Sequence, residues 1–393
     1  GRGYDYFYGF MAGETSQWEP TLWENTTRIS PPHVENHEDY HLTEDMADKA
    51  ITWMRRHLAV NPDRPFLMYW APGAVHGPHH VASQWADKYK GQFDDGWDAY
   101  QQRTFERQKK MGWIPADTKL APRPDGIPAW EDVPEEEKAF QARLMEVFAG
   151  FLEHTDVQVG KVIDELDARG IRDNTIVIYI LGDNGASAEG MEGSVAELNA
   201  QNGITSTVAE HIAVVEQLGG LDSVGGPKMD NMYHAAWAWS GDSPFRYTKL
   251  VASDWGGTRT PMVISWPKRI KPDKTPRSQF LHVNDVVPTI YDLLDITPPK
   301  VVDGHEQDPL DGVSFASTFD SADAPEVKKT QYFEIMGSRG IYHEGWMAST
   351  FGPRTPWVAK PIDLTKWEPK QDEWQLFDTR NDYSLMNDLA AEN

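Results

Sequence analysis

The sequence contains no cysteine among its 393 residues. Disulfides, thiolate metal sites and a cysteine nucleophile are therefore excluded from this stretch of chain. Long apolar runs are absent too, because no stretch approaches the ~20 consecutive apolar residues that a membrane-spanning helix needs. Basic residues are scarce, with 37 Lys and Arg against 61 Asp and Glu. The resulting formal charge of −24 argues against nucleic acid as a partner.

The chain also begins without an initiator methionine or a charged and then apolar leader. We therefore expect any targeting segment to lie outside this chain. The content of hydrophobic residues, 39%, is ordinary for a globular protein, and the length allows one large domain with a small one beside it.

Helical and strand patterns alternate along most of the chain. Buried-type strands are expected at residues 66–70, 175–181 and 261–266, and amphipathic helices at 43–58, with Thr43 as cap, 135–169 and 285–294. Residues 84–133 are expected to form a long surface excursion with short helices, and residues 186–243 another insertion. This alternation predicts an α/β fold with a mostly parallel central sheet flanked by helices.

The pattern changes after a Pro- and Asp-rich stretch at residues 298–325. Short strands separated by turns are expected at 330–335, 338–342, 345–350 and 374–378. We therefore expect an α/β domain over residues 1–325 and a small C-terminal antiparallel-sheet subdomain over residues 326–393.

The strand at 175–181 runs directly into Asp183 and Asn184, which lie between Gly182 and Gly185. Ligands of open α/β sheets bind just beyond the carboxyl ends of such strands. The side-chain oxygens of an Asp and an Asn suit Ca²⁺ or Mg²⁺ better than zinc. A turn that merely reverses the chain is the alternative interpretation.

Two further residues with suitable chemistry lie near other strand ends. His76 follows the expected strand at 66–70, and Lys249 precedes the strand at 261–266. A Lys and a His beside a cation would bind an oxyanion and move a proton to or from a leaving group. His79 and His80 compete with His76, and Lys249 could be an ordinary solvated lysine.

In combination, these segments resemble the type I sulfatases, the arylsulfatase branch of the alkaline-phosphatase-like superfamily. The resemblance covers nearly the whole chain, and it rests on the order and spacing of residues 6–10, 13–15, 40–45, the loop at 71–80, and residues 182–185, 256–261, 374–378 and 387–389. It implies that Asp183 and Asn184 bind a divalent metal, usually calcium with magnesium as the other possibility. It also implies that Lys249 contacts the sulfate and that His76 contacts the sulfate or its leaving oxygen.

The sequence departs from the family pattern in its nucleophile. The family uses a hydrated formylglycine made from a Cys/Ser-x-Pro-x-Arg motif, which this chain lacks, because residues 243–246 have their proline one place too early. Two further Asp ligands of the family, expected near its N-terminus, are missing as well. We therefore expect this chain to be an internal piece of a sulfatase that is inactive alone, with the formylglycine upstream.

The resemblance leads to a functional hypothesis and two rivals. The main hypothesis is a sulfuric ester hydrolase that acts on a small sulfate ester and is periplasmic or secreted, as the family implies. A phosphodiester or phosphonate monoester hydrolase of the same superfamily is one rival, and a catalytically inactive sulfatase-like binding protein is the other. The oligomeric state cannot be deduced from these patterns.

Overall fold

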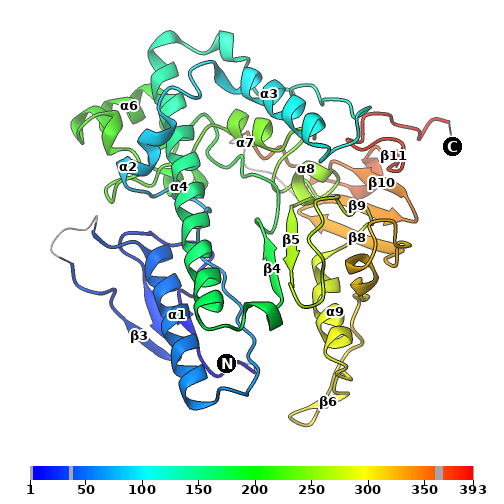
Figure 1. Ribbon diagram of the computed structural model, residues 1–393. Helices are drawn as coiled ribbons and strands as arrows, with labels where there is room; N and C mark the ends of the chain where they lie inside the picture. The colour runs from blue at the N-terminus through cyan, green and yellow to red at the C-terminus, as the bar shows by residue number, and fades with distance from the viewer. Residues whose placement is uncertain (1–2, 35–38, 359–365, 393) are drawn as a thin grey trace.

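The computed structural model describes residues 3–34, 39–358 and 366–392 (Figure 1). The helices are α1 (Leu42–Val60), α2 (Ser83–Ala86), α3 (Gly96–Met111), α4 (Glu135–Ala168), α5 (Glu197–Gln201), α6 (Val208–Gln217), α7 (Ala235–Gly241), α8 (Trp255–Thr258) and α9 (Val286–Leu293). The strands are β1 (Tyr8–Gly9), β2 (Leu22–Glu24), β3 (Thr27–Ile29), β4 (Val177–Ile180), β5 (Met262–Ser265), β6 (Val301–Val302), β7 (His305–Glu306), β8 (Thr330–Ile335), β9 (Ser338–His343), β10 (Trp346–Thr350) and β11 (Gln375–Asp378). Helices and strands occur throughout the described chain, as expected for the α/β class. None of the helices in these residues has the length and apolar character needed to cross a bilayer.

Helices α1 and α4 pack side by side along one flank of the molecule (Figure 1). Glu165 on α4 accepts hydrogen bonds from Arg55 on α1 at 2.8 and 2.6 Å, which ties the two helices together. The N-terminal cap of α1 is His41, whose ring nitrogen accepts the Thr43 backbone N–H at 3.2 Å. The prediction of Thr43 as the cap is therefore wrong, because the cap lies two residues earlier, at His41, and Thr43 is in the first turn of the helix.

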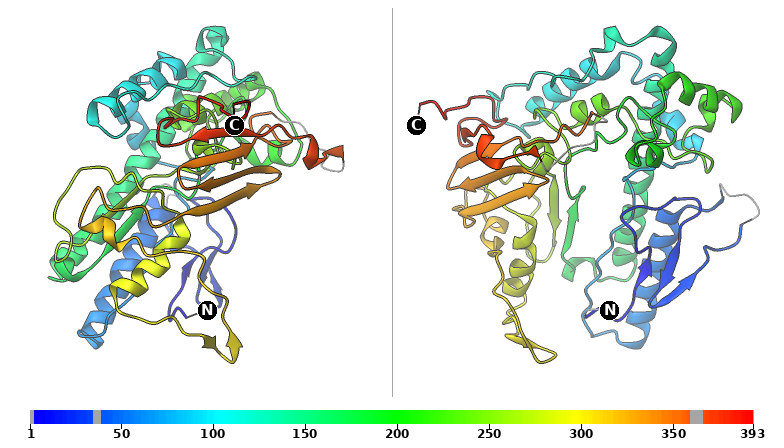
Figure 2. Two further views of the ribbon diagram at one scale, coloured as in Figure 1. Left: turned by 90° about the vertical axis from the view of Figure 1, so that its right-hand side faces the viewer. Right: turned by 180° about the vertical axis from the view of Figure 1, so that it is seen from behind.

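Strands β4 and β5 lie between the α1–α4 pair and α9, and views from opposite sides agree on this arrangement (Figures 1 and 2). The two strands pair antiparallel, with Val177 opposite Ser265 and Ile180 opposite Met262. The parallel pairing expected for this central sheet is not found among the described strands, whose named pairings are all antiparallel. The long connection at residues 181–261 allows β5 to return in the opposite direction.

Residues 66–70 form no strand, which corrects the expectation of a buried strand there. Their side chains alternate in exposure, with Leu67 64% and Tyr69 77% exposed. The apolar pattern of a strand is present, but a strand exists only when another backbone pairs with it. No such pairing occurs among the described residues.

The largest core cluster is formed by helices α3, α4 and α7. Trp97 on α3 and Trp237 on α7 are both buried, and their rings meet edge to face with centroids 5.6 Å apart. Residues 84–133, expected to form a surface excursion, therefore contribute to the core through α3. The insertion at 186–243 does the same through α7. Aromatic residues in these two segments build the interior that supports the loops after β4.

The C-terminal strands form a four-stranded antiparallel sheet in the order β11-β10-β9-β8, which confirms the strands expected from the sequence. One face of this sheet packs on residues 245–255 through a cluster of buried side chains: Phe245, Trp255, Tyr342, Met347, Phe377 and Leu385. The Ser338 hydroxyl also accepts the Ser253 backbone N–H at 3.2 Å. The sheet thereby supports the segment that carries Lys249.

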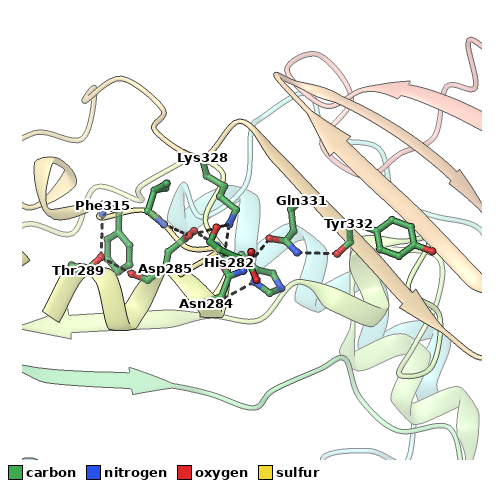
Figure 3. Close-up of polar contacts among 10 residues, drawn as sticks. His282, Asn284, Asp285, Thr289, Phe315, Lys328, Gln331 and Tyr332 are labelled. Carbon is green, nitrogen blue, oxygen red and sulfur yellow. Dashed lines mark hydrogen bonds and ion pairs between the residues drawn. The ribbon is translucent and has the colours of Figure 1, made fainter. Parts of the chain in front are cut away.

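A buried ion pair joins this sheet to α9 (Figure 3). The Lys328 ammonium, just before β8, lies 3.1 Å from Asp285 Oδ1 and 3.0 Å from Asn284 Oδ1. Asp285 also accepts the backbone N–H groups of His282 at 2.8 Å and Val313 at 2.9 Å. Each polar group of this buried network thus has a partner, as burial of charge requires.

Candidate active site

The turn after β4 brings Asp183 and Asn184 to the end of the strand. The backbone there has a positive φ of 98° at Gly182, which favours glycine. Gly185 then donates its N–H to Gly257 O at 3.0 Å. A Cβ on Gly185 would lie 1.7 Å from Gly256 O, so only glycine permits this approach of the two backbones. The glycine at position 185 is thus required by contact with residues 256–257 of helix α8.

Asp183 and Asn184 lie on the accessible side of this turn. Asp183 is exposed, and Asn184 is half-buried. The Asn184 amide nitrogen donates to Gly185 O at 2.9 Å, which orients the side chain and leaves its oxygen as a potential ligand. Two oxygen donors suit a hard cation but would fill only part of the six to eight positions around Ca²⁺. The described residues hold no cluster of three or more ligating His, Asp or Glu side chains.

Lys249 lies beside the same turn. Its backbone N–H donates to Ala186 O at 3.0 Å, so the loop that carries Lys249 runs alongside the segment after Asp183 and Asn184. Asp242 reinforces this geometry by accepting the Ala186 N–H with both carboxylate oxygens at 3.0 Å. Burial raises the pKa of the Asp242 carboxyl well above its usual value. The two loops are therefore fixed to each other by backbone contacts.

His76 meets Lys249 from the other side of the site. The Lys249 ammonium nitrogen lies 3.3 Å from His76 Nε2, although the two residues are 173 positions apart in the sequence. His76 Nδ1 lies 2.9 Å from Gly77 O, an acceptor, so the hydrogen-bond network places the proton of the neutral ring on Nδ1. Nε2 then presents its lone pair to the ammonium group. The structure thus brings together two of the residues selected from the sequence.

The neighbouring histidines are in a different environment. His79 and His80 are each 1% exposed, whereas the His76 side chain is 40% exposed. Burial lowers the pKa of His79 to about 3, and burial also lowers the pKa of His80, whose Nε2 contacts Met229 O. Both rings are buried parts of the interior, so His76 is the accessible histidine of this loop.

Two carboxylates that the sequence reasoning did not single out flank the His76–Lys249 pair. Glu189 Oε2 lies 2.7 Å from Lys249 Nζ, and Glu14 Oε2 lies 3.4 Å from His76 Nδ1. Burial alone would raise the pKa of Glu189, but the hydrogen bond and charge of Lys249 hold it below its usual value. Glu14 is within residues 13–15, which contributed to the resemblance, but a glutamate in a loop has no periodicity that would indicate its contacts.

Comparison with known proteins places this geometry in a family context. The family model described as Sulfatase matches residues 1–296, which is most of the chain. An uncharacterised sulfatase of Schizosaccharomyces pombe is 28% identical over 409 aligned positions, covering 99% of this chain and 67% of that protein. An arylsulfatase of Klebsiella aerogenes is 27% identical, covering 86% of this chain and 69% of that protein. The chain thus spans about two-thirds of the length of these relatives.

Solved structures support the same fold. The crystal structure of Ps i-CgsB in complex with k-i-k-neocarrahexaose is 18% identical, with a TM-score of 0.56, and the match covers 100% of this chain and 63% of that one. The putative sulfatase yidJ from Bacteroides fragilis is 17% identical, with a TM-score of 0.53, and the match covers 99% of this chain and 62% of that one. These structures share the fold of the chain, and the family model over residues 1–296 shows that the chain belongs to the sulfatase family.

Proposed function

We propose that this chain provides the sulfate-binding groups and part of the metal site of a sulfuric ester hydrolase. In this proposal His76 and Lys249 bind the sulfate ester, and Asp183 and Asn184 are two of the metal ligands. The observation that carries it is the 3.3 Å approach of Lys249 Nζ to His76 Nε2, beside the turn after β4, in a member of the sulfatase family.

The chemistry of the two groups suits charge that develops on a sulfate ester. A Lys249 ammonium held at the site stabilises negative charge on the sulfuryl oxygens without having to reorganise during the reaction. His76 Nε2 lies 3.3 Å from that ammonium group, so in this proposal the ring that moves a proton to the leaving oxygen is next to the group that binds the sulfate. Both groups are accessible, with side-chain exposures of 40% for His76 and 17% for Lys249.

Asp183 and Asn184 would hold a divalent cation, calcium by the family resemblance and magnesium as the alternative. When bound, the metal would supply positive charge at the sulfate oxygens, and a hydrated formylglycine would supply the attacking oxygen. The Cys/Ser-x-Pro-x-Arg motif that produces formylglycine does not occur in the printed residues. The nucleophile in this proposal therefore lies outside the chain described.

The test uses the full-length gene product and an aryl sulfate substrate. Lys249→Ala and His76→Ala should each lower kcat/KM by about 10²- to 10⁴-fold, since each removes a group that acts on the transition state. His343→Ala is the control, because that histidine is 64% exposed on β9 and should leave the rate unchanged. Either active-site variant retaining the wild-type rate would refute the assignment.

Two further experiments on the full-length protein test the metal requirement and distinguish a sulfatase from the two rival functions. Removal of the metal with a chelator should abolish turnover, and calcium or magnesium should restore it. A comparison of kcat/KM on an aryl sulfate with that on an aryl phosphodiester distinguishes a sulfatase from a phosphodiesterase. Binding of a sulfated ligand without any turnover by the full-length protein would instead identify a binding protein.

A further inference from the structure

Glu189 is the carboxylate nearest to the Lys249 ammonium, and it is held firmly in place. The ammonium nitrogen is 2.7 Å from Glu189 Oε2, and both side chains are 17% exposed. On its other side, Glu189 Oε2 accepts the Ser187 hydroxyl at 2.8 Å, and the Ser187 hydroxyl accepts the Glu189 backbone N–H at 3.2 Å. These two bonds limit the freedom of Glu189 to rotate away from Lys249 when an anion enters.

The balance of charge at this point is unusual for an anion-binding site. The Lys249 ammonium faces Glu189, and the ring of His76 faces both Lys249 and Glu14, whose Oε2 is 3.4 Å from Nδ1. Among the described residues, two carboxylates therefore flank one permanent cation and one histidine, next to the turn that is proposed to hold the divalent cation. A site built to attract as much negative charge as possible would not place carboxylates beside its lysine and histidine.

We propose that Glu189 is a specificity-determining residue, which makes the site favour singly charged sulfate esters over doubly charged phosphate monoesters. The inference rests on the proposed function, because it assumes that Lys249 contacts the ester anion. The Glu189 carboxylate partly neutralises Lys249 and lies close to any anion bound there. Its repulsion therefore acts about twice as strongly on a dianion as on a monoanion of the same shape.

Glu189 also positions Lys249. An ammonium group has three donors, and in the described structure one faces Glu189 while another faces His76 Nε2. The remaining donor is available for a sulfuryl oxygen. Without the carboxylate, the flexible four-carbon stem of Lys249 would sample other rotamers, and the ammonium would have to be reordered on binding.

The test measures binding of two inert anions of matched shape to the full-length protein at pH 8.5. Benzylsulfonate carries one negative charge, and benzylphosphonate carries two at this pH. Neither has an ester bond to hydrolyse, so calorimetry reports affinity separately from turnover. We expect the wild-type protein to bind the singly charged benzylsulfonate more tightly than the doubly charged benzylphosphonate. The ratio of the two dissociation constants is the quantity compared between variants.

Glu189→Gln should shift this ratio about ten-fold or more in favour of benzylphosphonate, since it removes one nearby negative charge and retains the shape of the side chain. Glu192→Gln is the matched control, because it removes the same charge from an exposed position of the same insertion. Ser187→Ala retains the carboxylate and should leave the ratio within about two-fold. If Glu189→Gln fails to fold, Glu189→Met provides the same loss of charge.

The possible results distinguish this inference from the proposed function. If Lys249→Ala binds both anions as tightly as the wild-type protein, the proposed site itself is wrong. If Lys249→Ala weakens both but Glu189→Gln leaves their ratio unchanged, the site stands and the role of Glu189 is refuted. An equal shift in Glu189→Gln and Glu192→Gln would also refute it, because the effect would then reflect net charge alone.

Discussion

At the scale of single residues, Gly185 decides how closely the two site loops approach each other. Its missing side chain allows the backbone after β4 to lie against residues 256–257 of helix α8, where a Cβ would overlap Gly256 O. The same contact fixes Ala186, which accepts the backbone N–H of Lys249. The lack of a side chain at Gly185 thus allows the turn that carries Asp183 to pack next to the loop that carries Lys249.

Gly185→Ala should therefore destabilise the protein by about 1–3 kcal/mol or more, because the loops must separate to admit the new methyl group. The measurement is the free energy of unfolding in urea. Gly160→Ala serves as control, since a Cβ at Gly160 within α4 would meet no other element within 4 Å, and alanine should be neutral or slightly stabilising there. Equal stability of the two variants would contradict the argument.

The sequence identified Asp183, Asn184 and His76 as candidates because each follows an expected strand, whereas Lys249 lies ahead of one and its role is implied by the resemblance to the sulfatases. Their roles in binding and catalysis remain predictions, whereas the contact between His76 and Lys249 is observed. Glu189 was missed because its contact with Lys249 depends on how two loops pack, and no spacing in the sequence encodes that. The distinction between His76 and the buried His79 likewise depends on tertiary burial.

At the scale of elements, the Lys328–Asp285 pair connects the C-terminal sheet to α9. Lys328 has a side-chain exposure of 4% and Asp285 of 0%, so neither charge is solvated. Thr289 extends the network, because its hydroxyl donates to Asp285 O at 2.7 Å and accepts the Phe315 N–H at 3.1 Å. The pair therefore fixes three segments relative to one another (Figure 3).

Lys328→Met should cost about 3–5 kcal/mol of unfolding free energy, because it leaves the Asp285 carboxylate buried without its cation. Urea denaturation followed by circular dichroism measures the loss. Lys329→Met is the control: the next residue is 58% exposed, and its ion pair with Glu344 should contribute less than about 1 kcal/mol. Similar losses for the two variants would show that the buried pair has no special role.

Strands were predictable where a short apolar run was followed by a turn, as in β8, β9, β10 and β11. Residues 66–70 have an equally strand-like composition and yet pair with no other backbone of the described chain. Composition indicates that a segment can form a strand, but the partner strand decides whether it does. The antiparallel direction of β5 relative to β4 was unpredictable for the same reason.

At the scale of the whole molecule, several histidines are buried in neutral form. Burial lowers the pKa of His41, His79 and His234 to about 3 in each case. In the unfolded chain these groups have pKa values near 6.5 and bind protons below that pH. Because the unfolded state then binds more protons than the folded state, stability must fall as the pH drops from about 6.5 toward 3.

Unfolding free energy measured between pH 7 and pH 5 should therefore decrease by up to about 1.4 kcal/mol per pH unit for each such histidine. His234→Asn should reduce that slope, since His234 is 6% exposed and stacks on Trp97. His343→Asn, at an exposed position on β9, should leave the slope unchanged. A slope that is the same in all three proteins would exclude the buried ring as its cause.

The exposed apolar side chains of residues 66–70 affect how the protein behaves in concentrated solution. Leu67 and Tyr69 are 64% and 77% exposed, and Val263 on β5 is 62% exposed. Exposed apolar side chains on unpaired backbone promote the aggregation of proteins through their edges. In a solution of the described chain alone, we therefore expect these side chains to cause self-association that increases with protein concentration. Light scattering and the binding of hydrophobic dyes should then rise together as the concentration is raised.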